Sequence, residues 1–318
     1  MKKIGFAVLL LTVAICFTAC KSDEIQKKKD AYRQLGIKYM QEGNYEGAID
    51  AFEDALDQSG AVIGESEIDT CYYKAQAQYL SGKTKDAVET YQALIAYDKK
   101  NADAYYLLGT LYLQEEDFGK AKENYDLALK YAGENYELYV AMYEQCSAAG
   151  LASDAQKYVK AGLANKGRSA EDYAQRGRIY LLLGDYDNAE AELDTALEKK
   201  SVEASLYMAQ LYEAQGEDEK AGSLYESYIQ ENKEDPVALN SLGMLKMEKQ
   251  DYEGAVECFT MALKIKNLSN EQEVRRNLIM AYEHKCDFAK AKSEMKSYVK
   301  DYPKDEEAAR EYLFLQTR

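Results

Sequence analysis

A small residue recurs along the chain at a nearly constant spacing. It is alanine in all eight cases, at positions 48, 87, 121, 155, 189, 221, 255 and 291, with spacings of 39, 34, 34, 34, 32, 34 and 36. Four positions after each alanine stands a large apolar residue: Phe52, Tyr91, Tyr125, Val159, Leu193, Tyr225, Phe259 or Met295. Twelve positions before each alanine the residue is small in six of eight units: Gly36, Ala75, Gly109, Tyr143, Gly177, Ala209, Gly243 and Ile279. Self-similarity at this period predicts an array of one repeated unit instead of the two globular domains that 318 residues would suggest.

Each unit contains two amphipathic helical patterns of about 12–15 residues. Five glycines fall at the turn between them, where a left-handed residue ends a helix: Gly43, Gly82, Gly150, Gly184 and Gly216. Because one helix pair cannot bury its apolar face alone, neighbouring units must stack. The first spacing of 39 predicts a longer loop near residues 59–66.

The two ends of the array have their own signals. Pro236 stands at the first helical position of the seventh unit, where its missing N–H is harmless, and Pro303 separates the eighth unit from a last helix. Asp305 is the expected N-cap of that helix. Its predicted apolar face is Ala308, Ala309, Tyr312, Leu313 and Leu315. We therefore expect a helix that covers the eighth unit.

The unit resembles the tetratricopeptide repeat. The runs that carry the resemblance are Tyr105…Leu108-Gly109…Tyr112…Ala121…Tyr125…Ala128 and Tyr32…Leu35-Gly36…Tyr39…Ala48…Phe52…Ala55. Departures are Lys74 and Arg176 where Leu is usual, Tyr143 and Ile279 at the small position, and Leu94, Tyr228 and Tyr298 at a second small position. The resemblance covers residues 29–303 and implies an all-α fold, an α-solenoid with a right-handed superhelix of about eight helix-turn-helix repeats and a C-terminal capping helix over residues 304–318.

The first twenty residues differ from the rest. Lys2 and Lys3 precede an apolar stretch from Ile4 to Phe17, which is short for a membrane span and typical of a signal peptide. The stretch ends Phe17-Thr18-Ala19-Cys20, which resembles the bacterial lipobox. The resemblance implies cleavage of residues 1–19, a diacylglyceryl group on Cys20 and a tether over residues 20–28. An ordinary secretory signal and an uncleaved anchor are the alternatives.

Composition excludes several classes of function. Forty Lys and Arg stand against 56 Asp and Glu, so the net charge of −16 argues against nucleic acid as a partner. One histidine, no Gly-rich phosphate loop and no Cys-x-x-Cys leave no candidate catalytic or metal site, and we expect no cofactor and no enzymatic activity. Besides Cys16 and Cys20, the chain has Cys71, Cys146, Cys258 and Cys286, of which only the last two lie on adjacent units and could pair.

In the tetratricopeptide repeat family the first helix of each repeat lines a concave channel. The fifth, ninth and twelfth positions of each unit face that channel by analogy. The candidate ligand-contacting residues are Arg33, Ile37, Met40, Tyr72, Gln76, Tyr79, Tyr106, Thr110, Leu113, Arg178, Asn240, Met244 and Arg276. Aromatic residues and Met without a core role favour contact with a polypeptide. Stacking of Tyr72, Tyr79 and Tyr106 between helices is the alternative.

The second position of seven units is acidic: Asp30, Asp69, Asp103, Glu137, Glu171, Glu203 and Glu273. One interpretation is that these carboxylates stabilise the helix N-termini by interacting with the helix dipole. The other is that they form an acidic rim that selects basic partners. Together these features suggest a protein-binding scaffold or adaptor, held by lipid at the extracytoplasmic face of a bacterial cell membrane or outer membrane, with other proteins or peptides of the cell envelope as partners. A lipoprotein that captures a solute or peptide for an uptake system is the alternative.

Overall fold

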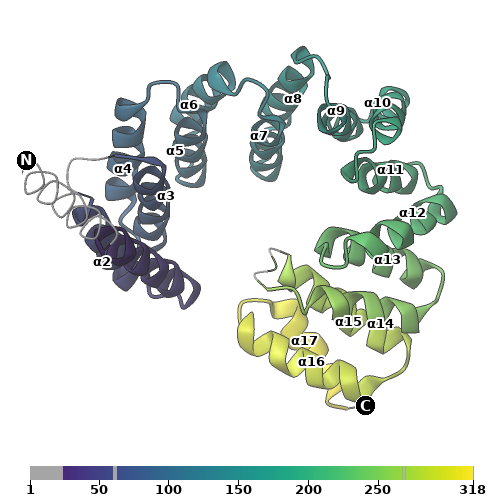
Figure 1. Ribbon diagram of the computed structural model, residues 1–318. Coiled ribbons are helices and arrows are strands. Elements are labelled where there is room, and N and C mark those ends of the chain that lie inside the picture. The colour runs from purple at the N-terminus through teal and green to yellow at the C-terminus, as the bar shows by residue number, and fades with distance from the viewer. Residues whose placement is uncertain (1–23, 60–62, 267, 269, 318) are drawn as a thin grey trace, which may run out of the picture. The chain divides into compact units, whose positions relative to one another are not determined.

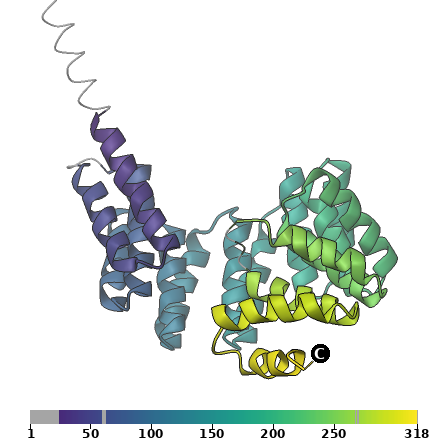
Figure 2. The same cartoon turned by 90° about the horizontal axis from the view of Figure 1, so that it is seen from below.

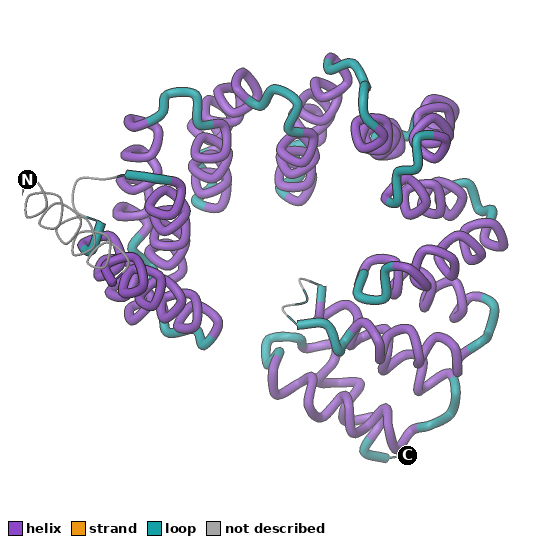
Figure 3. Tube along the Cα trace, in the orientation of Figure 1, coloured by secondary structure: helices purple, strands orange, loops and turns teal. Residues whose placement is uncertain are grey.

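The computed structural model describes residues 24–59, 63–266, 268 and 270–317. The predicted signal peptide and Cys20 lie outside the described residues. Among the described residues there is no β-strand, and the chain divides after Gly162 into two compact units (Figure 1). The fold is therefore all-α, as the sequence predicts, with short loops between successive helices (Figure 3).

The first unit consists of four helix pairs. Its helices are residues 24–41, α2 (Tyr45–Asp57), α3 (Glu65–Leu80), α4 (Thr84–Tyr97), α5 (Ala102–Gln114), α6 (Phe118–Tyr131), α7 (Tyr136–Ala148) and α8 (Ala152–Ala161). A short 3₁₀ turn, Gly162–Ala164, follows. Residues 24–28 of the predicted tether are helical and continuous with the first repeat helix.

The second unit consists of four further pairs and a single last helix. Its helices are α9 (Ala170–Leu182), α10 (Tyr186–Glu198), α11 (Glu203–Ala214), α12 (Asp218–Glu231), α13 (Pro236–Glu248), α14 (Tyr252–Ala262), α15 (Glu271–His284), α16 (Phe288–Asp301) and α17 (Glu306–Leu315). The last helix contacts α16, beside which it lies in Figure 2. No helix in the described ranges has both the length and the apolar character needed to cross a bilayer.

The predicted repeat register is confirmed at the crossing of each helix pair. All eight recurring alanines are at most 1% exposed, and the eight large residues that follow them are at most 5% exposed. A Cβ built on Gly109 would lie 2.7 Å from Cδ1 of Tyr125, and a Cβ on Gly177 would lie 2.5 Å from Cγ of Leu193. The small position is small because the large side chain of the same repeat packs directly on its backbone.

The turn inside each pair has one residue with positive φ. The five predicted glycines occupy this position with φ between 72° and 83°. In the third, seventh and eighth repeats the position is held by Glu116, Gln250 and Cys286, with φ between 60° and 62°. Side chains with a Cβ adopt this conformation at a cost of about 1 kcal/mol, so repeat geometry overrides local preference at these three turns.

At two positions where the family usually has Leu, this chain has a cation that forms an ion pair. The ammonium of Lys74 lies 2.8 Å from a carboxylate oxygen of Glu53 on the preceding helix. The guanidinium of Arg176 donates to Glu192 at 2.7 Å and to the carbonyl oxygens of Leu163 and Asn165. Each cation thus keeps a polar partner at a position where an apolar residue is usual, and the fold is unchanged.

The last helix is confirmed, but part of its predicted face is wrong. The carboxylate of Asp305 caps α17 by accepting from the backbone N–H of Ala308. Ala308 and Leu315 are fully buried and Tyr312 packs against the same core, whereas Ala309 is exposed and Leu313 is 63% exposed. The buried side of α17 is a narrow stripe at i, i+4 and i+7, and Ala309 and Leu313 lie outside it.

The four described cysteines are free thiols. Cys258 is buried and Cys286 is exposed, so the pairing that the sequence left open does not form.

Candidate functional site

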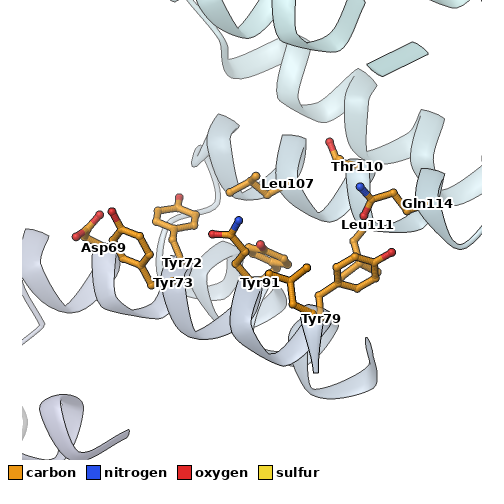
Figure 4. A pocket seen from close by; sticks show the side chains of 11 residues that line it. Asp69, Tyr72, Tyr73, Tyr79, Tyr91, Leu107, Thr110, Leu111 and Gln114 are labelled. Atoms are coloured by element: carbon orange, nitrogen blue, oxygen red, sulfur yellow. The ribbon is translucent and has the colours of Figure 1, made fainter. Parts of the chain in front are cut away.

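A groove of about 310 Å³ lies between the first helices of the second and third repeats, α3 and α5. Four predicted residues line it: Tyr72, Gln76 and Tyr79 from α3, and Thr110 from α5. Figure 4 shows the rings of Tyr72 and Tyr79 on one side of the groove and the side chains of Leu107 and Thr110 on the other. The fifth, ninth and twelfth positions of the second repeat therefore come together, as the resemblance implies.

The position of these side chains follows from helix geometry. Residues at i, i+4 and i+7 lie on one face of a helix, which places Tyr72, Gln76 and Tyr79 in a row along α3. Asp69 lies at the N-terminal end of the same row. Tyr91 of α4, the buried large residue of the second repeat, also lines the groove.

Two of the predicted tyrosines also stabilise the repeats. The hydroxyl of Tyr72 donates to Oδ1 of Asn101 at 2.8 Å, and its ring centroid lies 6.5 Å from that of Tyr91. The ring of Tyr106 stacks on that of Tyr125 with centroids 6.0 Å apart, and Tyr106 does not line the groove. Burial raises the pKa of Tyr72 to about 12, so its hydroxyl stays protonated and keeps this hydrogen bond at neutral pH. Tyr72 and Tyr106 therefore stack between helices, which was the alternative to ligand contact. Tyr79 offers the groove more aromatic surface for contact with another molecule.

Side chains at the fifth position link successive repeats. Arg33 pairs with Asp69 of the next repeat, and Nδ2 of Asn240 donates to Glu273 of the next repeat at 3.0 Å. Arg276 of the eighth repeat donates to Glu311 of α17 at 2.7 Å. Sequence reasoning assigned these fifth-position residues to ligand binding and did not foresee the links. For Arg33 and Asn240 the signal was present, because a complementary residue stands at the second position of the next unit.

These links also account for part of the acidic row at the second position. The carboxylates of Asp69 and Glu273 accept from the preceding repeat, and Glu203 accepts from Nε2 of Gln175 at 3.3 Å. The dipole interpretation alone is therefore incomplete for these three residues.

Apart from Leu113 of α5, the remaining predicted residues lie in other repeats. Ile37 and Met40 are half-buried and pack against the first repeat's core, and Leu113 is 7% exposed and belongs to the core. In the second unit, the guanidinium of Arg178 lies over the ring of Tyr207 at 5.5 Å, and Met244 packs against buried residues of the last repeats. The expectation that Leu113 contacts a ligand is wrong, because the side chain is enclosed between its own repeat and the next.

Asp69 is the charged residue among those that line the groove, and it pairs with Arg33 of the preceding repeat. Burial is the main cause of the raised pKa of Tyr72, and the carboxylates of Asp103 and Asp98 add to it. Across the described ranges, no group of three or more His, Cys, Asp or Glu side chains is arranged to hold a metal ion. His284, the one histidine, is exposed and stacks on Tyr252 with ring centroids 5.3 Å apart. The arrangement offers stiff aromatic surface, amide groups and carboxylates, which suit recognition of another molecule.

Comparison with known protein families gives matches to three repeat models. A model described as TPR repeat matches residues 75–116, and two described as tetratricopeptide repeat match residues 174–236 and residues 102–135 and 237–267. The second and third repeats, which form the groove, lie largely within these matches.

Curated relatives are distant and much longer. The chain is 23% identical over 271 residues to BBSome complex member BBS4 of Bos taurus, covering 82% of this chain and 51% of that protein. It is 23% identical over 179 residues to protein O-mannosyl-transferase TMTC1 of Homo sapiens, covering 55% of this chain and 20% of that protein. The chain thus spans about half or less of the length of these relatives.

Among solved structures, a tetratricopeptide repeat protein from Parabacteroides merdae is similar to this chain. The TM-score is 0.52 at 16% identity, and the match covers 80% of this chain and 99% of that one. At this identity the likeness supports the fold.

Proposed function

Because this chain is a tetratricopeptide repeat protein, we propose that it is a non-enzymatic scaffold that binds a polypeptide of the cell envelope in the groove between α3 and α5. Proteins of this fold typically mediate protein–protein interaction. The observation that carries the proposal is the row of Tyr72, Gln76 and Tyr79 facing Thr110 across an open groove. Aromatic side chains supply large contact area at low entropic cost, and amides beside them can pair with a peptide backbone.

Tyr79→Ala is expected to weaken capture of the partner by about 2 kcal/mol, roughly 30-fold, if Tyr79 is an interface hot spot. Tyr79 is half-buried and packs in part against the core of the second repeat, so the melting temperature is expected to fall only modestly. The measurement is recovery of cross-linked envelope polypeptides from intact cells, together with a melting curve of each variant.

Tyr79→Phe is the matched control, because it keeps the ring and should retain capture. Equal capture by wild type and Tyr79→Ala would contradict the groove assignment. A small solute that raises the melting temperature of wild type but not of Tyr79→Ala would favour the uptake-system alternative instead.

We further propose that a lipid on Cys20 holds this scaffold at the extracytoplasmic face of the membrane. The lipobox-like end of the N-terminal apolar stretch supports the proposal. Three residues separate Cys20 from the helix described from residue 24 onward, and four residue steps span at most about 14 Å. A lipidated Cys20 would therefore keep the first repeat close to the bilayer surface.

Cys20→Ala is expected to move the protein from the membrane fraction to the soluble or culture fraction, because a second acyl chain at one site is what makes anchoring durable. Fractionation of cells and mass spectrometry of the mature N-terminus check this. An unmodified Cys20 in wild type, with both proteins in the membrane fraction, would refute the anchor.

A further inference from the structure

A second, larger hollow lies on the opposite face of α3 from the groove. It has a volume of about 620 Å³ and is bounded by α2, α3 and α4. On α3 its lining residues include Ile68, Cys71 and Lys74. They are interspersed in the sequence with the groove-lining residues of α3 and lie on the other face of the helix. The hollow occurs where the family's usual Leu is replaced by Lys74, whose side chain turns to Glu53, so the space between the neighbouring second helices is not filled.

The floor of the hollow is apolar, and two large apolar side chains stand at its rim. Leu56, Ile68 and Leu94 line it, and Leu94 is 5% exposed. At the rim, Ile63 is 53% exposed and Tyr97 is 56% exposed. The two residues are neighbours, because the hydroxyl of Tyr97 lies 3.5 Å from the backbone oxygen of Ile63. Exposed apolar side chains beside an apolar hollow are a feature of docking surfaces.

The charges around the hollow are predominantly negative. Asp86 and Glu89 of α4 are exposed at its edge, as is Glu53 of α2. The one lining cation, Lys74, is committed to Glu53 at 2.8 Å. Lys85 lies 3.8 Å from Glu89, but this pair is exposed and contributes little. Glu67 also lines the hollow and pairs with Lys29 at 2.5 Å. The lining therefore has four carboxylates and one lysine, and a cation on an incoming molecule would meet net negative charge.

We propose that this hollow is a second docking site, for a polypeptide segment that presents a large apolar side chain next to a lysine or arginine. The apolar side chain enters the hollow between Leu56 and Leu94, and the basic residue faces Asp86 and Glu89. An anionic lipid surface is disfavoured as the occupant because the rim has the same sign of charge. The proposal is independent of the groove, because the two surfaces lie on opposite faces of α3.

Cys71 provides a reporter inside the site. Its thiol lines the hollow and is half-buried, whereas Cys286 is exposed on a different repeat and Cys146 and Cys258 are buried. The probe is the peptide acetyl-Gly-Lys-Leu-Phe-Lys-Gly-amide, with a matched peptide carrying Glu in place of both Lys. Alkylation of each thiol by iodoacetamide is followed by mass spectrometry on the full chain without its signal peptide, with and without peptide.

The basic peptide, at about ten times its dissociation constant, is expected to slow alkylation of Cys71 about tenfold and leave Cys286 unchanged. The acidic peptide should protect neither thiol. No protection of Cys71 by the basic peptide, or equal protection by both peptides, would each overturn the proposal. Protection by anionic vesicles alone would assign the hollow to lipid and overturn it as well.

A pair of substitutions on α4 separates this site from the groove. Ala93 lines the hollow and Ala96 does not, and both are exposed. Ala93→Trp should fill the hollow and lower the affinity for a fluorescent form of the basic peptide at least about tenfold, while Ala96→Trp should not. Equal affinity of the two variants for the basic peptide would place the peptide elsewhere and overturn the proposal. If instead Tyr79→Ala captures its partner as well as wild type does, only the groove proposal fails, and the result for the hollow still stands.

Discussion

Gly109→Trp is expected to lower the free energy of unfolding of the first unit by about 3 kcal/mol, at the upper end of the usual cost of overpacking. A Cβ at position 109 would lie 2.7 Å from Cδ1 of Tyr125 and 3.2 Å from the backbone oxygen of Ala121. Tyr125 cannot move aside freely, because it is 1% exposed and its ring contacts Tyr158 with centroids 5.6 Å apart. A large side chain therefore forces α5 and α6 apart.

The damage should be centred on the third repeat, since stability in a repeat array is built from interfaces between neighbours. Chemical denaturation and hydrogen exchange of α5 and α6 measure both the size and the place of the effect. Gly119→Trp is the matched control: a Cβ there lies 3.7 Å from its nearest neighbour, Oδ1 of Asp117, on an exposed position. Equal stability of the two variants would contradict the repeat register.

Glu67→Gln is expected to destabilise the first unit by about 3 kcal/mol, because breaking a buried ion pair leaves an uncompensated charge. Glu67 is 7% exposed and accepts from Nζ of Lys29 at 2.5 Å, from Oγ of Ser59 at 2.7 Å and from the backbone N–H of Gly64 at 2.8 Å. The substitution leaves Lys29, which is 9% exposed, without its carboxylate. This pair ties the first repeat helix to α3.

The pH dependence has a definite sign. Burial by itself raises the pKa of Glu67, but the hydrogen bonds from Lys29, Ser59 and Gly64 outweigh it and lower the pKa from 4.5 to about 2. A depressed pKa in the folded state contributes stability that is present above about pH 4.5 and is lost as the pH falls toward 2. The stability difference between wild type and Glu67→Gln should therefore shrink across this window.

Denaturation midpoints between pH 7 and pH 2 provide the measurement. Lys38→Met is the control, because Lys38 and Glu42 form an exposed pair at 3.7 Å that contributes at most about 1 kcal/mol. A difference between wild type and Glu67→Gln that stays constant down to pH 2 would show that the charge of Glu67 does not stabilise the fold.

Much of the fold is predictable from the sequence because each repeat imposes the same steric demand. The contact between Gly109 and Tyr125 recurs between Gly243 and Phe259, where a Cβ would lie 2.5 Å from Cε1 of the ring. One small and one large residue at fixed positions therefore specify both the helix pair and its crossing. The exposed side of α17 was less predictable, because its tertiary contacts with the eighth repeat decide which apolar residues of that helix become buried.

The groove was predictable in part. Helical periodicity places Gln76 and Tyr79 on one face, and the structure brings them together with Thr110. Arg33 and Asn240 have the same repeat position as Tyr72, yet their polar groups bind the next repeat. Position in the repeat gives the direction of a side chain, but whether it meets a neighbour depends on the residue opposite, which belongs to another unit.

The proposal that the groove binds a polypeptide is tested most directly by site-specific photo-cross-linking in living cells. A photoreactive amino acid replaces Gln76, which is exposed and lines the groove, or Gln156, which is exposed on α8 and does not line it. After irradiation, we expect discrete polypeptide adducts with the protein labelled at position 76 and none with the protein labelled at position 156. Adducts that are absent at position 76, or that are the same at both positions, would contradict it.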